Sequence, residues 1–175
     1  MKKIAIAVAG LFVCVAAHAA EKSVVVPMSS VSIDGTGASV GKVTVRESAG
    51  GLVFTPDLKG LPPGNHGFHL HEKPSCAVGE KDGKKGAALA AGGHFDPQKV
   101  GKHEGPEGMG HEGDLPRITV GDDGTDTTAV TAPHIKTLAT LKGHALMIHA
   151  GGDNYSDTPE ALGGGGGRIA CGVVK

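Results

Sequence analysis

Two histidines stand two residues apart in the segment Phe68-His69-Leu70-His71. In a β-strand, residues two apart point to the same side, so both imidazoles would share one face, with Phe68 and Leu70 on the other. Two parallel imidazoles make half of a tetragonal nitrogen site, which is the arrangement that copper(II) prefers. The pair therefore suggests a copper site, although histidine pairs also occur on ordinary strand surfaces.

Three more histidines and a carboxylate follow in the segment 92–114, which reads GGHFDPQKVGKHEGPEGMGHEGD. Three imidazoles and one carboxylate fill a closed tetrahedral zinc sphere and leave no position for a reacting water. The glycines and prolines between them would let a backbone without regular structure fold around the ion. The sequence therefore predicts a structural zinc site with the ligands His94, His103, His111 and Asp114.

A further histidine, His149, ends the apolar run ALMIH, and Asp153 follows four residues later in AGGDN. Together with His69 and His71, His149 offers three nitrogens to one ion, whereas a tetragonal copper site needs a fourth. If His94 supplied that nitrogen, one imidazole would bind both metals.

The elements that must position these groups are predicted to be strands. Thirty glycines, ten prolines and 3% aromatic residues argue against a helical bundle. Short β-branched runs between turn residues predict an antiparallel sheet, and GKVTVRE at 41–47 alternates as a strand with one buried face does. Eight strands predict a two-sheet sandwich or a flattened barrel. They cover 23–29, 41–47, 51–55, 66–71, 117–120, 127–132, 145–149 and 168–174.

Two long connections, 72–116 and 151–167, have no strand pattern. Connections of this length are uncommon unless they are functional or disordered. Both contain groups that bind ligands, so we interpret them as ordered functional loops, with disorder as the alternative. The glycine run 163–167 lacks the Lys-Ser/Thr ending of a phosphate loop and indicates instead a close approach of the backbone to a site.

The first residues have the pattern of a secretory signal peptide. The basic MKK precedes an apolar run at 4–15, and small residues flank His18 in Ala17-His18-Ala19. The run is too short to cross a bilayer, so no membrane span is expected. We predict that 1–19 is cleaved and that 20–175 forms one domain. A lipoprotein anchored at Cys14 is the alternative, but the preceding LFV lacks the expected small residue.

Cleavage would remove two lysines and leave 15 basic and 18 acidic residues, a formal charge of −3. A chain without a basic tract is not expected to bind nucleic acid. Any anionic substrate must be attracted by a local field, because the global charge repels it.

The same cleavage leaves two cysteines, Cys76 and Cys171. In an oxidising compartment they permit one intramolecular pairing. Two free buried thiols are the alternative, which export disfavours.

Five segments together resemble the bacterial periplasmic copper-zinc superoxide dismutases: GFHLHE, GGHFDP, GKHEGPEGMGHEGDLP, MIHAGGDNYSD and GGGGGRIACGVV. The resemblance covers essentially all of the chain after the signal peptide. It implies an all-β fold, an eight-stranded Greek-key barrel or Ig-like β-sandwich with two long functional loops, in the periplasm. It also implies conversion of superoxide to oxygen and hydrogen peroxide by copper redox cycling. Each subunit of a monomer or homodimer would hold one copper and one zinc ion.

The resemblance also implies roles for individual residues. The copper ligands would be His69, His71, His94 and His149, and the zinc ligands His94, His103, His111 and Asp114. Asp153 matches a carboxylate that accepts hydrogen bonds from His69 and His103. Cys76 and Cys171 match the family's disulfide, and Arg168 matches an arginine beside copper. His94 and Arg168 are thereby the expected catalytic residues, and His94 would carry a proton to the product.

Three lysines, Lys81, Lys84 and Lys85, lie in the first long connection. They would extend the attracting field toward the site, unless they only form a solvated surface.

The remaining histidines, His66, His134 and His144, match no ligand position and are expected to be surface or packing residues. Two rival functions use the same ligands without turnover. One is a periplasmic metal store or copper carrier, and the other is a structural sandwich in which zinc only braces a loop.

Overall fold

Most of the predicted strands pair into one curled antiparallel sheet. The computed structural model describes residues 22–175, so the predicted signal peptide lies outside the described residues. Seven strands follow the order β5-β10-β11-β1-β2-β3-β9, and two small sheets pair β4 with β8 and β6 with β7. The bounds are β1 Ser23–Ser32, β2 Gly35–Ser48, β3 Gly51–Leu58, β4 Gly64–His66, β5 Phe68–His71, β6 Gly79–Lys81, β7 Lys84–Gly86, β8 Ile118–Val120, β9 Val130–Ala132, β10 Ala145–His149 and β11 Arg168–Val173.

Three short 3-10 helices complete the elements: η1 Leu89–Ala91, η2 Leu138–Leu141 and η3 Ala161–Gly164. Within the described residues, no helix is long and apolar enough to cross a membrane. The all-β prediction is confirmed.

The alternation in the sequence fixes which side chains enter the core. In β2, Val43 and Val45 are buried whereas Arg46 is exposed, as the GKVTVRE pattern predicts. The core centres on Phe54 and Phe68, whose rings pack edge to face with centroids 5.7 Å apart. Such an aromatic pair adds to the stabilisation that comes from burial alone.

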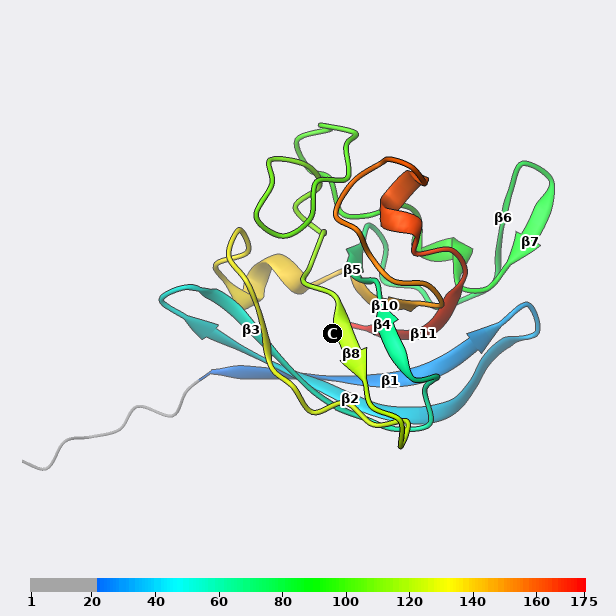
Figure 1. Cartoon of the computed structure of the whole chain (residues 1–175), viewed down its shortest axis with the longest axis horizontal. Coiled ribbons are helices and arrows are strands. Elements are labelled where there is room, and N and C mark those ends of the chain that lie inside the picture. The colour runs from blue at the N-terminus through cyan, green and yellow to red at the C-terminus, as the bar shows by residue number, and fades with distance from the viewer. Residues whose placement is uncertain (1–21) are drawn as a thin grey trace, which may run out of the picture.

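The sheet curls where the pairing of β1 with β2 slips. The register shifts between Met28 and Ser29 and again between Ser29 and Val31. Irregularities of this kind bend a strand and increase its twist. Figure 1 shows β1 and β2 as a long curved hairpin, with the loops 92–114 and 151–167 together on the opposite side of the molecule.

Two predictions about individual strands were wrong. The expected strand 66–71 is divided between β4 and β5, because the Gly67 N–H donates to the Gly151 carbonyl instead of to a sheet neighbour. The connection 72–116, expected to contain no strand, contains the hairpin of β6 and β7. That hairpin has no buried face, so its sequence carries no apolar alternation. By contrast, β10 spans the predicted 145–149.

A disulfide joins Cys76 in the first long connection to Cys171 on β11. The alternative of two free thiols is therefore wrong. The bond ties the segment that carries η1 and the β6–β7 hairpin to the central part of the sheet.

We expect the loss of this disulfide to destabilise the fold strongly. It closes a loop over a sequence separation of 95 residues, for which the chain-entropy model gives about 4–5 kcal/mol. Urea denaturation of the metal-free Cys76→Ser/Cys171→Ser variant should show this loss in the free energy of unfolding. The unmutated protein, reduced and alkylated, is the control and should lose a similar amount. A loss below about 1 kcal/mol would contradict the expectation.

Candidate metal centre

Four buried histidines converge at one end of the curled sheet. His69 and His71 lie on β5, and β5 pairs with β10 so that Met147 is opposite His69. His149 ends β10, and His94 reaches the site through an isolated bridge to His71. One ligand nitrogen from each of the four lies within 4.8 Å of the others. We call this the four-histidine cluster.

The β5 strand is buried on both faces. Phe68 and Leu70 belong to the hydrophobic core, and the two histidines that alternate with them face the cluster. This is the arrangement expected from the H-x-H spacing.

A second group is built entirely from the loop 92–114. His94, His103, His111 and Asp114 also offer ligand atoms within 4.8 Å of one another. Asp114 Oδ1 lies 2.8 Å from His94 Nδ1 and 3.3 Å from His111 Nδ1, and Asp114 Oδ2 lies 3.0 Å from His103 Nδ1. We call this the histidine–aspartate cluster. His94 belongs to both clusters.

Unpaired nitrogen atoms show that these clusters suit metal ions. His69 Nδ1 and His94 Nε2 are buried and have no hydrogen-bond partner, and His103 Nδ1 has only its ion contact with Asp114. A buried polar atom without a partner costs free energy, which a bound ion would recover. Soft and borderline metals such as copper and zinc take imidazole nitrogen as a ligand. The donor set therefore fits the two ions.

Hydrogen bonds to the backbone orient the other two rings of the four-histidine cluster. His71 Nδ1 donates to the Gly92 carbonyl at 3.0 Å, and His149 Nδ1 lies 3.3 Å from the Gly166 carbonyl. Their Nε2 atoms lie 3.4 Å apart inside the cluster. A proton held on Nδ1 leaves Nε2 with a free lone pair, which is the state that binds metal.

Burial keeps the four-histidine cluster uncharged. It lowers the pKa of His69, and it lowers the pKa values of His71 and His149 well below their ordinary value. For His94, burial together with the neighbouring His69 lowers the pKa to about 4. Removing an imidazolium from water disfavours its charge. The rings are therefore neutral at pH 7, so each can bind one metal without losing a proton. Only His94, if both of its nitrogens bound metals, would have to lose its remaining proton.

In the histidine–aspartate cluster, His103 and Asp114 are instead stabilised in their charged forms. Burial acts to lower the pKa of His103, but the carboxylates of Asp114 and Asp153 outweigh it and raise the pKa to about 9. Burial likewise acts to raise the pKa of Asp114, but His103 and His94 hold it below its usual range. The carboxylate is thus ionised and supplies the negative charge that a divalent cation needs.

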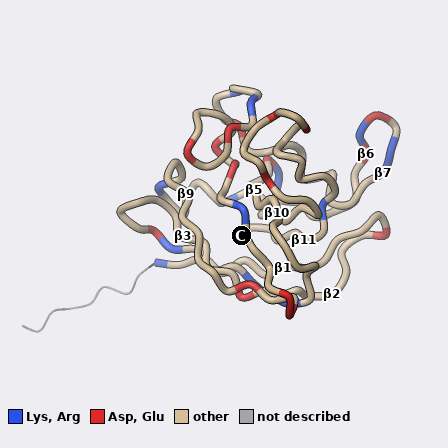
Figure 2. The backbone as a smooth tube through the Cα atoms, viewed as in Figure 1, with Lys and Arg blue, Asp and Glu red and all other residues tan. Residues whose placement is uncertain are grey.

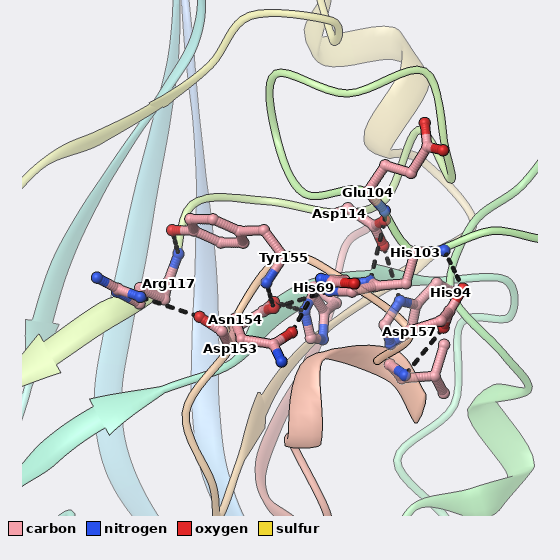
Figure 3. A network of polar contacts seen from close by, with 12 residues as sticks. His69, His94, His103, Glu104, Asp114, Arg117, Asp153, Asn154, Tyr155 and Asp157 are labelled. Carbon is pink, nitrogen blue, oxygen red and sulfur yellow. Dashed lines mark hydrogen bonds and ion pairs between the residues drawn. The ribbon is translucent and has the colours of Figure 1, made fainter. Parts of the chain in front are cut away.

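Asp153 forms a hydrogen bond to one ring of each cluster. His69 Nε2 donates to its Oδ2 at 2.7 Å, and His103 Nε2 donates to its Oδ1 at 2.8 Å. Figure 3 shows these contacts converging on one carboxylate. Although His69, His103 and Asp153 also lie close enough to form a metal group, their facing nitrogens carry the donated protons. Asp153 therefore orients the rings instead of forming a third site.

Arg168 begins β11 beside the four-histidine cluster. Its Nη1 donates to the Ala88 carbonyl at 2.6 Å, and its Nη2 donates to the Gly92 carbonyl at 2.5 Å. The Gly92 carbonyl also accepts the proton of His71 Nδ1. Arg168 and His71 thus donate to the same carbonyl oxygen, which places the guanidinium next to the cluster.

The three lysines lie on the β6–β7 hairpin and are exposed. Figure 2 shows this hairpin projecting from the molecule, with blue along its strands and red at its tip. His134 is exposed and His66 is buried between the carbonyls of Pro62 and His149. His144 Nδ1 contacts the carbonyls of His71 and Glu72. None of these three histidines belongs to a cluster, as expected.

Sequence reasoning missed several residues that support the site. Asp157 accepts the His103 N–H at 2.9 Å and the Leu162 N–H at 3.1 Å. Glu72 Oε2 accepts the Gly93 N–H at 3.0 Å, directly before His94. The contacts with Gly93 and His103 join residues 21 and 54 positions apart, so no local pattern indicates them. The available signal was that Asp157 and Glu72 lie in the motifs GGDNYSD and GFHLHE.

Comparisons with known proteins agree with this geometry. The sequence profile described as copper/zinc superoxide dismutase (SODC) matches residues 39–174. The chain is 55% identical over 175 residues to the superoxide dismutase [Cu-Zn] of Escherichia coli strain K12, with all of both chains covered.

Two solved structures are similar as well. The Cu/Zn superoxide dismutase from Brucella abortus has a TM-score of 0.86 and 55% identity, covering 88% of this chain and all of the other. The monomeric copper, zinc superoxide dismutase from Salmonella enterica, solved in solution, has a TM-score of 0.79 and 58% identity with the same coverage.

Proposed function

Because this chain belongs to the copper/zinc superoxide dismutase family, we propose that its two histidine clusters hold the two metals of that enzyme. The protein is an oxidoreductase that converts superoxide to oxygen and hydrogen peroxide, with copper and zinc as cofactors. The four-histidine cluster would hold copper, because four neutral imidazoles suit a tetragonal copper site. The histidine–aspartate cluster would hold zinc, because its three imidazoles and one carboxylate close a tetrahedral sphere.

One observation carries this assignment. The two nitrogens of the buried His94 ring serve different clusters: Nδ1 lies 2.8 Å from Asp114 Oδ1, and Nε2 has no hydrogen-bond partner. A lone histidine in a core would instead satisfy both nitrogens within the protein. His94 is therefore proposed as the shared ligand.

Two superoxide anions and two protons give one oxygen and one hydrogen peroxide. Copper, when bound, supplies the one-electron couple for this disproportionation, which zinc does not have. We assign to His94 Nε2 the transfer of a proton to the product. The histidine–aspartate cluster would hold the Nδ1 side of the ring during this transfer, so that Nε2 keeps its position in the four-histidine cluster.

Arg168 would attract and orient the anion. Its guanidinium stays charged at pH 7 and presents a planar fork of donors, and it is fixed by two main-chain carbonyls. A local positive charge is needed, because the chain without residues 1–19 carries a formal charge of −3.

We further propose that residues 1–19 direct export and that the enzyme acts in the periplasm. The basic and apolar composition of this segment supports export, and a disulfide is stable in an oxidising compartment. The proposal admits a monomer, as the Salmonella enterica relative is titled, or a homodimer.

The decisive experiment combines metal analysis with superoxide consumption for residues 20–175 loaded with copper and zinc. The protein should hold about one copper and one zinc per chain. His149→Ala should lose copper and nearly all activity but keep zinc, because His149 belongs only to the four-histidine cluster. Arg168→Ala should keep both metals and lose about tenfold in kcat/KM.

His134→Ala is the matched control, because His134 is exposed and outside both clusters. Full activity in His149→Ala would refute the copper assignment. Bound metals without superoxide turnover in the unmutated protein would favour the metal store over the enzyme.

The exposed lysines of the β6–β7 hairpin give a second prediction. Lys84→Glu/Lys85→Glu should lower kcat/KM at low ionic strength, because it reverses two exposed charges on the β6–β7 hairpin. The difference should shrink above about 0.1 M salt, where the Debye length falls to about 10 Å. Lys59→Glu/Lys136→Glu is the control, since it changes the net charge equally at other exposed positions. Equal kcat/KM values for the two double variants at low ionic strength would contradict a role of this hairpin in attracting the substrate.

A further inference from the structure

The position of Asp153 affects both clusters at once. Its two oxygens bind different rings, His69 at 2.7 Å and His103 at 2.8 Å. A small displacement of this carboxylate therefore lengthens a hydrogen bond in each cluster. Groups that fix Asp153 would act on both sites without belonging to either.

Arg117 holds the main chain at Asp153. Its Nη1 donates to the Asp153 carbonyl at 3.0 Å, and its backbone N–H donates to the Tyr155 hydroxyl at 3.1 Å. The guanidinium carbon also lies 5.4 Å from the centre of the Tyr155 ring, within the range of a cation–π contact. One residue thus contacts the segment 153–155 at three points, and Figure 3 marks the two hydrogen bonds among them.

Tyr155 closes the turn around the Asp153 carboxylate. Its N–H donates to Asp153 Oδ1 at 2.8 Å, and its φ of 60° lies in the left-handed region that residues other than glycine seldom adopt. A residue persists in this region when its surroundings hold it there. The contacts to Arg117 are part of that surrounding structure.

The other side of Tyr155 lies against the loop of the histidine–aspartate cluster. A Cβ added at Gly105 would come within 2.5 Å of Tyr155 Cβ, and Gly105 follows His103 by two residues. Arg117 itself follows Asp114 by three residues and directly precedes β8. The pair therefore joins the two loops that carry the metal-binding groups.

We propose that Arg117, acting with Tyr155, is a positioning residue that holds Asp153 in register with both metal sites. Arg117 is exposed and is in neither cluster, so its role is retention of the metals and not contact with substrate. The inference rests on the metal assignments proposed above.

The test compares the release of zinc to a chelator from the copper- and zinc-loaded protein in Arg117→Ala and in the unmutated protein. Groups behind metal ligands typically change affinity by about 10–100-fold, and Arg117 acts one contact further away. We expect Arg117→Ala to release zinc about 3–10-fold faster and to alter the copper(II) electron paramagnetic resonance spectrum. Arg117→Lys keeps the charge but not the planar fork, so its rate of zinc release should lie between those of Arg117→Ala and the unmutated protein.

Lys136→Ala is the matched control. Lys136 is an exposed cation whose Nζ donates to the Gly50 carbonyl at 3.3 Å, so its removal also deletes one charge and one hydrogen bond to the main chain. Its zinc release and its spectrum should equal those of the unmutated protein.

A double-mutant cycle separates positioning from general destabilisation. In an Asp153→Ala background, Arg117→Ala should have no further effect on zinc release, because the carboxylate that it positions is gone. An equal effect in both backgrounds would overturn the proposal, as would unchanged release accompanied by a salt-dependent loss of kcat/KM. If the unmutated protein held no copper or zinc at the clusters, the metal assignments would fail first. Bound metals with normal release in Arg117→Ala would contradict only this inference.

Discussion

The structure depends on one buried imidazole that serves two clusters. His94 comes from a loop, yet its ring lies beside three neutral histidines that the sheet brings together. A buried nitrogen without a partner is costly, so an ion at His94 Nε2 would make this arrangement favourable, while Nδ1 already faces Asp114. The chain must therefore hold a loop without regular structure as firmly as it holds a strand.

Sheet and loop divide this task. The register of β5 with β10 fixes His69, His71 and His149 relative to one another, and their rings are oriented by backbone carbonyls and by Asp153. The loop obtains its rigidity from contacts with other segments instead. Asp153 and Asp157 bind His103 by its side chain and its backbone, and the disulfide restrains the preceding segment. Arg168 donates to the Gly92 carbonyl, which also accepts the His71 proton, so the charge proposed to attract substrate is fixed to the same group as a ligand.

The sequence predicted the parts of the molecule that local patterns encode. Alternation determined the faces of β2 and β5, and the limits of β10 were those expected from ALMIH. The break at Gly67 was missed because its cause is a hydrogen bond to Gly151, far along the chain. The β6–β7 hairpin was missed because neither strand has a buried side. The hydrogen bond from Arg117 to the Asp153 carbonyl joins residues 36 positions apart, and only the folded chain brings them together.

X-ray diffraction at the absorption edges of copper and zinc, on crystals of the loaded protein, tests the shared imidazole most directly. The account predicts two distinct ions, copper bonded to His94 Nε2 and zinc bonded to His94 Nδ1, each at about 2.0–2.1 Å. An ion on only one nitrogen of His94, with the other ion held by the remaining residues of its cluster, would contradict it.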